Sequence, residues 1–233
     1  MKLRIAAIIV FLAGATLLSG SVMRSRKART TKPKPFVVQY LAYRPNKSGA
    51  LEVYEFRVRA VSQTGEWKET RYSTYGKAFT WGAQKDGLFT ASEDSRQFYG
   101  EFNPEIATTA MRSEDELKNN PQFAGTEEIA GLSTYILRMN DAGLEANYSP
   151  KTGMTALKEV LRDTKTNAVI YLQEAVSVEF RDLSVDEIKL PDLPVRFDLI
   201  NHRIEVMQAA HQDNKAAALS EAVSKFRADQ SRK

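Results

Sequence analysis

Residues 51–75 read LEVYEFRVRAVSQTGEWKETRYSTY, and this stretch decides the fold class. Polar and apolar residues alternate up to residue 62, which predicts a strand with two unlike faces, because successive side chains of a strand point to opposite sides. A turn sequence at 63–65 follows, and a second mixed stretch begins at Trp67. The segment therefore predicts an antiparallel β-hairpin. In the first strand the predicted dry face holds Tyr54, Phe56, Val58 and Ala60, and the predicted wet face holds Glu55, Arg57 and Arg59.

Short strand candidates continue on both sides of this hairpin, most of them separated by glycine, asparagine or aspartate turns. They lie at 36–43, 78–82, 88–92, 97–102, 131–140, 144–148, 154–161 and 168–180. A short helix is expected after Ser113, because Ser113 and Glu116 have the spacing of a capping box and Pro121 ends the helix. The predicted fold class is α+β, mainly β, with an antiparallel meander and short helices.

The periodicity changes after Pro194. Apolar residues then recur at spacings of three and four residues, which predicts one long amphipathic helix from about residue 198 to about residue 229. Its stripe is poor in large side chains, so it buries little area per turn. Two uses of the helix stay open: packing back on the sheet, and self-association or docking on a partner. The stripe consists of Ile200, Ile204, Met207, His211, Ala218, Ala222 and Phe226.

The first 35 residues contain no acidic residue. A cationic start, an apolar run at 5–18 and small residues at 19–21 are typical of an export signal peptide, and equally of an uncleaved inner-membrane anchor over residues 5–23. Residues 24–35 are basic and contain proline, which indicates an extended linker. We expect residues 1–23 to direct the protein to the periplasm or another extracytoplasmic space, a β domain at 36–194, and the helix at 195–233.

The charge distribution argues against nucleic acid as a partner. The chain has a net charge of +4, but residues 1–35 contain eight basic residues and no acidic one, so the remainder carries −4. Nucleic-acid binding needs lysine and arginine on the folded surface that meets phosphate. The chain also contains no cysteine, which excludes disulfides and a lipid-modified cysteine.

The sequence offers no metal site and no cofactor motif. A catalytic carboxylate pair is left open in principle in the loop-rich middle, although such residues normally form a solvated rim; the candidates are Glu93, Asp94, Glu101 and Glu105. His202 and His211 are the only histidines, and nine residues of helix place them on nearly opposite faces, so they cannot share a metal ion. No glycine-rich phosphate-binding loop is present. We therefore expect the protein not to be an enzyme.

Two segments resemble exported β-rich proteins of the LolA-like kind. Residues 58–77 resemble the early hairpin of that group, and residues 145–154, EANYSPKTGM, resemble its strand ending in an aromatic-x-Pro turn. The later strand to Val178 and the closing Ile188–Pro191 also fit the pattern. The resemblance implies a strongly curved antiparallel sheet, a half-barrel, which encloses a hydrophobic cavity; in the namesake carriers this cavity holds lipoprotein acyl chains. The strand at 36–43 and the long terminal helix depart from the pattern.

Two functions follow as hypotheses. The first is a non-enzymatic envelope protein that binds a hydrophobic ligand, a lipid or an acylated partner, in an unfilled hollow on the concave face of the sheet. The second is a structural or protein-interaction module that acts through the C-terminal helix, with the hollow filled by side chains. The residues expected to line the hollow are Tyr54, Phe56, Val58, Trp67 and Trp81.

Overall fold

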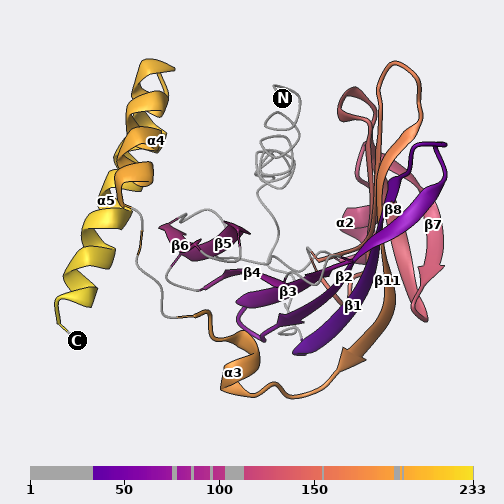
Figure 1. Ribbon diagram of the computed structural model, residues 1–233, viewed down its shortest axis with the longest axis horizontal. Helices are drawn as coiled ribbons and strands as arrows, with labels where there is room; N and C mark the ends of the chain where they lie inside the picture. The colour runs from indigo at the N-terminus through magenta and orange to yellow at the C-terminus, as the bar shows by residue number, and fades with distance from the viewer. Residues whose placement is uncertain are drawn as a thin grey trace. The chain divides into compact units, whose positions relative to one another are not determined.

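The computed structural model describes residues 34–74, 78–84, 87–94, 97–102, 113–153, 155–191, 195 and 197–232 (Figure 1). The predicted signal or anchor at 1–23 and nearly all of the predicted linker at 24–35 lie outside these residues. Among the described helices, none has both the length and the apolar character needed to cross a membrane.

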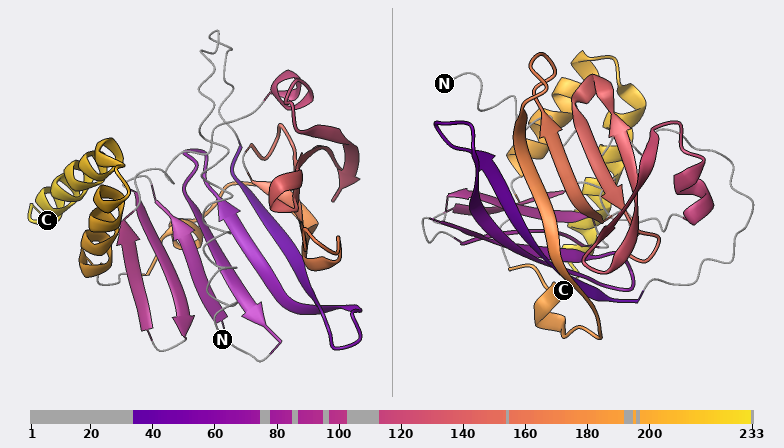
Figure 2. Two further views of the ribbon diagram at one scale, coloured as in Figure 1. Left: turned by 90° about the horizontal axis from the view of Figure 1, so that it is seen from above. Right: turned by 90° about the vertical axis from the view of Figure 1, so that its right-hand side faces the viewer.

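The described strands form one antiparallel sheet of eleven strands in the order β6-β5-β4-β3-β2-β1-β11-β10-β9-β8-β7 (Figure 2). The first strand therefore lies in the middle of the sheet, between β2 and β11. The predicted strands are all found, and β7 is an additional strand that the sequence analysis missed. The bounds are β1 Phe36–Pro45, β2 Leu51–Val61, β3 Trp67–Ser73, β4 Ala78–Ala83, β5 Leu88–Asp94, β6 Gln97–Phe102, β7 Phe123–Ile129, β8 Leu132–Met139, β9 Leu144–Tyr148, β10 Ala156–Arg162 and β11 Val169–Phe180.

The helices between the strands are short. The predicted capping box begins α2 (Glu114–Lys118): the Ser113 hydroxyl accepts the Glu116 N–H at 3.1 Å, and the Glu116 carboxylate accepts the Ser113 N–H at 2.8 Å. The 3-10 helix η1 (Asn140–Ala142) and α3 (Val185–Ile188) were not predicted. The predicted class, mainly β with an open and strongly curved antiparallel sheet, is confirmed.

The sheet curls until the turn between β7 and β8 lies against one face of β1, β2 and β3. This packing defines the inner face of the sheet, and it buries Phe36, Val38 and Tyr40 of β1 almost completely. The hollow that the resemblance implies is therefore filled, at this end, by the chain's own side chains. The inner apolar cluster also contains Val61, Trp67, Ile129, Ala130, Leu132, Leu157, Ala175, Val178 and Phe180.

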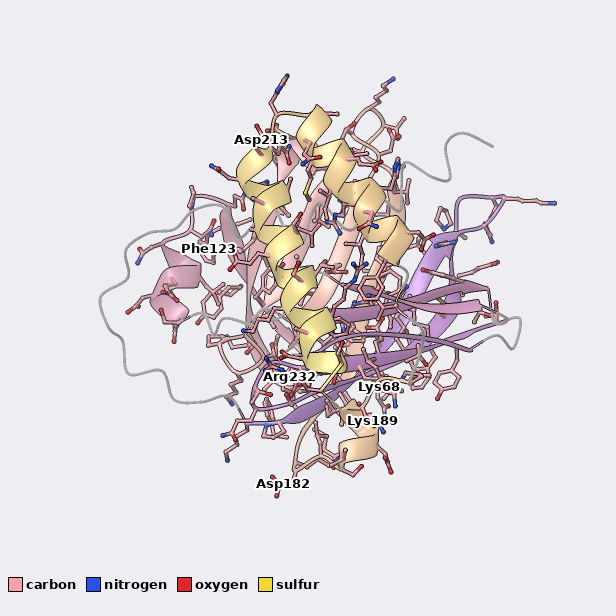
Figure 3. All side chains as sticks on the ribbon, turned by 90° about the vertical axis from the view of Figure 1, so that its left-hand side faces the viewer. Lys68, Phe123, Asp182, Lys189, Asp213 and Arg232 are labelled. Carbon is pink, nitrogen blue, oxygen red and sulfur yellow. The ribbon has the colours of Figure 1, made fainter. Side chains whose placement is uncertain are left out.

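The C-terminal segment is helical as predicted, but it forms two helices rather than one. These are α4 (Phe197–Ala209) and α5 (Asp213–Gln230), which lie side by side (Figure 3). The helices bury apolar residues against each other, so the predicted stripe is largely internal to the pair. The buried residues of this cluster are Ile200, Leu219, Val223 and Phe226, with Ile204, Met207 and Ala222 packed against them.

His211 causes the break between α4 and α5. Its backbone is left-handed, with φ of 57°. The His211 N–H bonds to the Gln208 carbonyl at 3.0 Å, and the Gln212 N–H bonds to the Met207 carbonyl at 2.8 Å. This is the Schellman pattern, which usually ends a helix at glycine. Because the chain has histidine at this position, the apolar spacing continued through it and the sequence predicted an unbroken helix.

Replacing His211 with glycine is expected to stabilise the helix pair by roughly 0.5–1 kcal/mol. Glycine adopts a left-handed backbone without the steric cost that a Cβ brings, although part of the gain is lost to the greater freedom of glycine in the unfolded chain. Slower amide exchange at Gln212 would report the gain. A His211→Ala variant, which keeps the Cβ, is the control and should show no such slowing.

Candidate functional site

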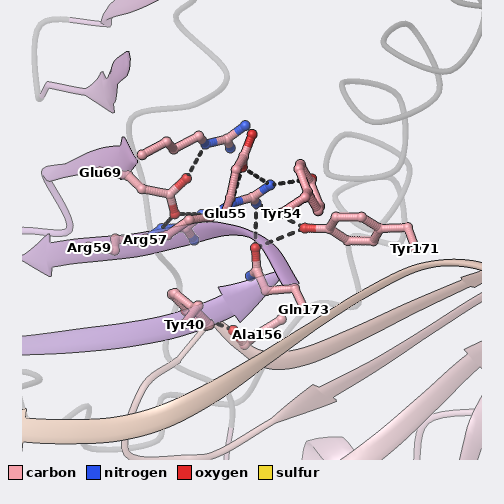
Figure 4. A network of polar contacts seen from close by, with 10 residues as sticks. Tyr40, Tyr54, Glu55, Arg57, Arg59, Glu69, Ala156, Tyr171 and Gln173 are labelled. Carbon is pink, nitrogen blue, oxygen red and sulfur yellow. Dashed lines mark hydrogen bonds and ion pairs between the residues drawn. The ribbon is translucent and has the colours of Figure 1, made fainter. Parts of the chain in front are cut away.

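The inner face of β2 and β3 carries charged residues beside the apolar cluster. The register pairs Arg57 with Arg71 and Arg59 with Glu69, so these four side chains share one face. Arg57 is only 3% exposed and Glu69 is 0% exposed. The prediction that the charged face of this hairpin is the wet one is therefore wrong. We call Arg57, Arg59, Glu69, Arg71, Glu55, Tyr54, Tyr171 and Gln173 the inner-face network (Figure 4).

Every nitrogen of the Arg57 guanidinium donates a hydrogen bond. Its Nε donates to Glu55 at 2.8 Å, and its Nη2 lies 2.6 Å from the same carboxylate and donates to the Tyr54 hydroxyl at 3.0 Å. Its Nη1 donates to the Tyr171 hydroxyl and to Gln173 of β11. With a partner at every guanidinium nitrogen, Arg57 joins β2 to β11 as a structural residue.

Glu69 lies between two further arginines. Arg59 approaches one of its carboxylate oxygens through Nε at 2.8 Å and Nη2 at 2.7 Å, and Arg71 approaches the other through Nε at 2.6 Å. Each guanidinium also stacks on a tryptophan ring at 4.7 Å from the centroid, Arg59 on Trp67 and Arg71 on Trp81. Two Arg–Trp pairs therefore flank one buried carboxylate.

These contacts set the electrostatics of the network. Burial works to raise the pKa of Glu69, but Arg59, Arg71 and Arg57 outweigh it and bring the pKa from 4.5 down to about 2. Glu159, on the inner face of β10 opposite Gln173, differs: burial raises its pKa in spite of the attraction of Arg59 and Arg57. Glu69 is thus held as a carboxylate, whereas burial raises the pKa of Glu159 and makes its ionisation less favourable.

The structure separates the five predicted lining residues. Trp67 and Trp81 both lie on the inner face, in β3 and β4, at diagonal positions of the register: Trp81 is opposite Glu69, and Trp67 is opposite Ala83. Phe56 and Val58 alternate with Arg57 and so lie on the outer face, where the Phe56 ring is 6.1 Å from that of Tyr72. Tyr54 is the extra residue at a β-bulge opposite Ala42 and Tyr43, and its hydroxyl accepts from Arg57.

Sequence reasoning missed the arginines and Glu69 as site residues, although a signal was present. Trp67, Glu69 and Arg71 are spaced two residues apart, so they must share one face of β3, and an aromatic residue on that face points to burial. The bulge at Tyr54 has no comparable signal.

The described residues show no metal cluster at the network. No group of three or more His, Cys, Asp or Glu residues within the described part of the chain could hold a metal ion. A surface pocket of about 580 Å³ lies elsewhere, between the ends of β2 and β3 and the segment that contains α3. Its lining includes Ser62, Glu66, Gln84 and Lys189, and none of the network residues.

No known protein family and no curated protein matches this sequence. Among solved structures, a chain of the Pseudomonas aeruginosa MucA/MucB complex is 13% identical with a TM-score of 0.43, and the match covers 68% of this chain and 56% of that one. A LolA superfamily protein from Nitrosomonas europaea is 10% identical with a TM-score of 0.37, covering 70% and 93%. A putative outer membrane lipoprotein-sorting protein domain from Vibrio parahaemolyticus is 8% identical with a TM-score of 0.30, covering 69% and 91%.

At these identities the similarity concerns the overall fold alone. This chain spans little more than half the length of the MucA/MucB chain, and one of the three structures, that from Nitrosomonas europaea, carries the name of the group that the sequence resembles. What the protein binds has to be argued from its own residues.

The low pKa of Glu69 predicts that acid destabilises the fold. A carboxyl whose pKa is lower in the folded chain stabilises it above the ordinary value of 4.5, and this contribution, of the order of a few kcal/mol, is lost as the pH falls toward about 2. The raised pKa of Glu159 acts in the opposite sense. Urea unfolding at a series of pH values should show the loss, and a Glu69→Gln variant should show a flatter profile.

Proposed function

We propose that this chain is a non-enzymatic binding module of the cell envelope, which holds a lipid or the acylated segment of a partner on the inner face of its sheet. The leader segment directs it out of the cytoplasm and either is removed or anchors it to the inner membrane. The observation that carries the proposal is the pair of half-buried tryptophans, Trp67 and Trp81, at diagonal positions of neighbouring strands on the inner face.

The position of the ligand follows from what already fills the inner face. The end at β1 and β11 is closed by the turn between β7 and β8, with Phe36 and Ile129 each only 2% exposed. The face over β3 and β4 is less covered, since the side chains of Arg59 and Arg71 are each 20% exposed and both tryptophans remain partly accessible. We therefore place the apolar part of the ligand against Trp67 and Trp81, where each buried methylene contributes about 0.8 kcal/mol.

The alternative role is a partner surface on the C-terminal helix, and it depended on an exposed apolar stripe. The apolar stripe is used within the α4–α5 pair, with Ile200 0% and Phe226 7% exposed. The sides of the pair that face away from this stripe are rich in charged and amide residues. We therefore do not advance this role as a second candidate.

Tryptophan fluorescence tests the proposal directly, because the chain contains only two tryptophans and both lie on the inner face. The probe is stearyl alcohol brominated at mid-chain, whose bromines quench tryptophan at contact, added to the purified full chain below its aggregation limit. We expect saturable quenching of roughly half of the emission or more, since a tail long enough to cross two strands reaches both rings.

A matched control moves the reporter to the other face. In a Trp67→Phe, Trp81→Phe, Tyr72→Trp variant the single tryptophan replaces a tyrosine that is 48% exposed on the outer face. This variant should not be quenched saturably. Equal quenching in the control and in the native chain, or no quenching of the native chain by any brominated lipid, would contradict the proposed function.

A further inference from the structure

We propose that the ligand of the inner face carries an anionic group, a carboxylate or a phosphate, and that this group binds to Arg59 and Arg71 while its apolar part lies on Trp67 and Trp81. The inference rests on the proposed function and names the class of ligand that the same face takes: an anionic amphiphile.

The charges of the network do not balance around Glu69. Arg57 and Glu55 form a pair of their own, with 2.6 Å between Nη2 and the carboxylate. The remaining triad contains two guanidiniums, those of Arg59 and Arg71, and the single carboxylate of Glu69. One positive charge is therefore left without a carboxylate in the triad. Glu159 of β10 also faces inward, but it forms no ion pair with either arginine among the described residues, and its burial disfavours the charged form by raising its pKa.

The two arginines also have unused hydrogen-bond donors. Arg59 bonds Glu69 through Nε and Nη2, and Arg71 bonds it through Nε. Nη1 of Arg59, and both Nη1 and Nη2 of Arg71, have no partner among the residues that the structure describes. Arg57, in contrast, has a partner at every guanidinium nitrogen. A planar guanidinium matches the two oxygens of a carboxylate or phosphate, so the free edges of Arg59 and Arg71 are suited to an anion.

The surroundings hold these guanidiniums in place before any ligand arrives. Glu69 fixes Nε of both, and the rings of Trp67 and Trp81 lie 4.7 Å from the guanidinium carbons. Each side chain is 20% exposed, so it remains within reach of a ligand. Little side-chain entropy is then lost on binding, and the low local dielectric strengthens the interaction with an anion.

Burying the three charges of the triad costs desolvation free energy, which argues that the triad serves a role other than stability. Replacing a buried ion triad by apolar residues of similar volume is often neutral or stabilising. A ligand-binding role explains why Arg59, Glu69 and Arg71 occupy the inner face, where apolar residues would continue the neighbouring apolar cluster without a desolvation penalty.

The experiment compares brominated probes that differ only in the headgroup, using quenching of the full chain. Brominated stearic acid and brominated stearyl phosphate are expected to bind about tenfold or more tighter than the brominated alcohol, because hydrogen bonds to a charged group are worth more than neutral ones. Inorganic phosphate alone is added in competition: displacement of the acid identifies a site that takes the free anion, and lack of displacement identifies a site that needs the lipid. Both results support an anion-binding site.

Variants make the test specific to the two arginines. A triple Arg59→Met, Glu69→Leu, Arg71→Met variant should stay folded by circular dichroism and bind the acid and the alcohol within about twofold of each other. The matched control, Arg138→Met, removes an arginine 53% exposed on the outer face and should keep the full preference for the acid.

The outcomes separate the inference from the proposed function. Equal binding of acid and alcohol by the native chain, or a preference for the acid that survives in the triple variant, overturns the anion site and leaves the lipid-binding role standing. Absence of quenching by every probe overturns both.

Discussion

Replacing Glu69 with alanine is expected to lower the free energy of unfolding by about 3–5 kcal/mol, because it leaves two arginines without their partner in a mostly buried position. Glu69 is 0% exposed, accepts a hydrogen bond from Nε of Arg59 and one from Nε of Arg71, and lies 2.7 Å from Nη2 of Arg59. The partial exposure of the two arginines limits the loss, since each can turn its charged end toward water. Urea unfolding followed by circular dichroism measures the change as a shift of the midpoint at constant slope.

The control for this prediction is Arg138→Ala, which breaks an ion pair with Glu145 in which the arginine is 53% exposed. Exposed pairs contribute little, so this variant should lose no more than about 1 kcal/mol. A Glu69→Gln variant should fall between the two, because the amide oxygen still accepts from one arginine. If Glu69→Ala were as stable as Arg138→Ala, the inner-face network would be solvated rather than buried.

The sequence predicted most of the sheet because its strands are short, alternate in polarity and end at glycine or Asx turns. It missed β7, whose residues Phe123–Ile129 form an edge strand with mostly exposed positions and little alternation. It also joined α4 and α5, since a histidine instead of a glycine occupies the left-handed position at His211. These failures occur where local residue preference is weak and tertiary contacts decide.

The candidate site was predictable only in part. Trp67 and Trp81 were expected and lie on the inner face, whereas Phe56 and Val58 lie on the outer face. The error came from taking charge as a sign of exposure, which holds for most sheets with one wet face. In this curved sheet the buried charges have partners on other strands: Arg57 bonds to Tyr171 and Gln173 of β11, and Glu69 of β3 pairs with Arg59 of β2. Such pairs depend on register, which composition does not reveal.

The sheet depends on its first strand, because β1 pairs with β2 on one side and with β11, the last strand, on the other. The N-terminal part of the sheet, β1–β6, meets the C-terminal part, β7–β11, where β1 pairs with β11. The residues paired at this junction are far apart in the sequence. The inner-face network crosses the same junction, since Arg57 of β2 donates to Tyr171 and Gln173 of β11. We expect the two halves to unfold together, with coincident transitions by tryptophan fluorescence and circular dichroism.

Replacing Phe36 with alanine is expected to lower the free energy of unfolding by about 3–5 kcal/mol, through lost burial and the cavity left behind. Phe36 is 2% exposed on β1, opposite Val61 and Phe180, and its ring centroid lies 5.8 Å from that of Phe180. The urea midpoint should shift by this amount with an unchanged slope.

Phe123→Ala is the matched control, because Phe123 lies on edge strand β7, is 36% exposed and contacts Tyr135 with 6.3 Å between ring centroids. It should lose clearly less, about 1 kcal/mol, since much of its ring is already in water. A loss in Phe36→Ala no larger than in Phe123→Ala would mean that the β1 end of the inner face is not closed. The ligand would then have room at that end, and the placement of its apolar part over Trp67 and Trp81 would have to be given up.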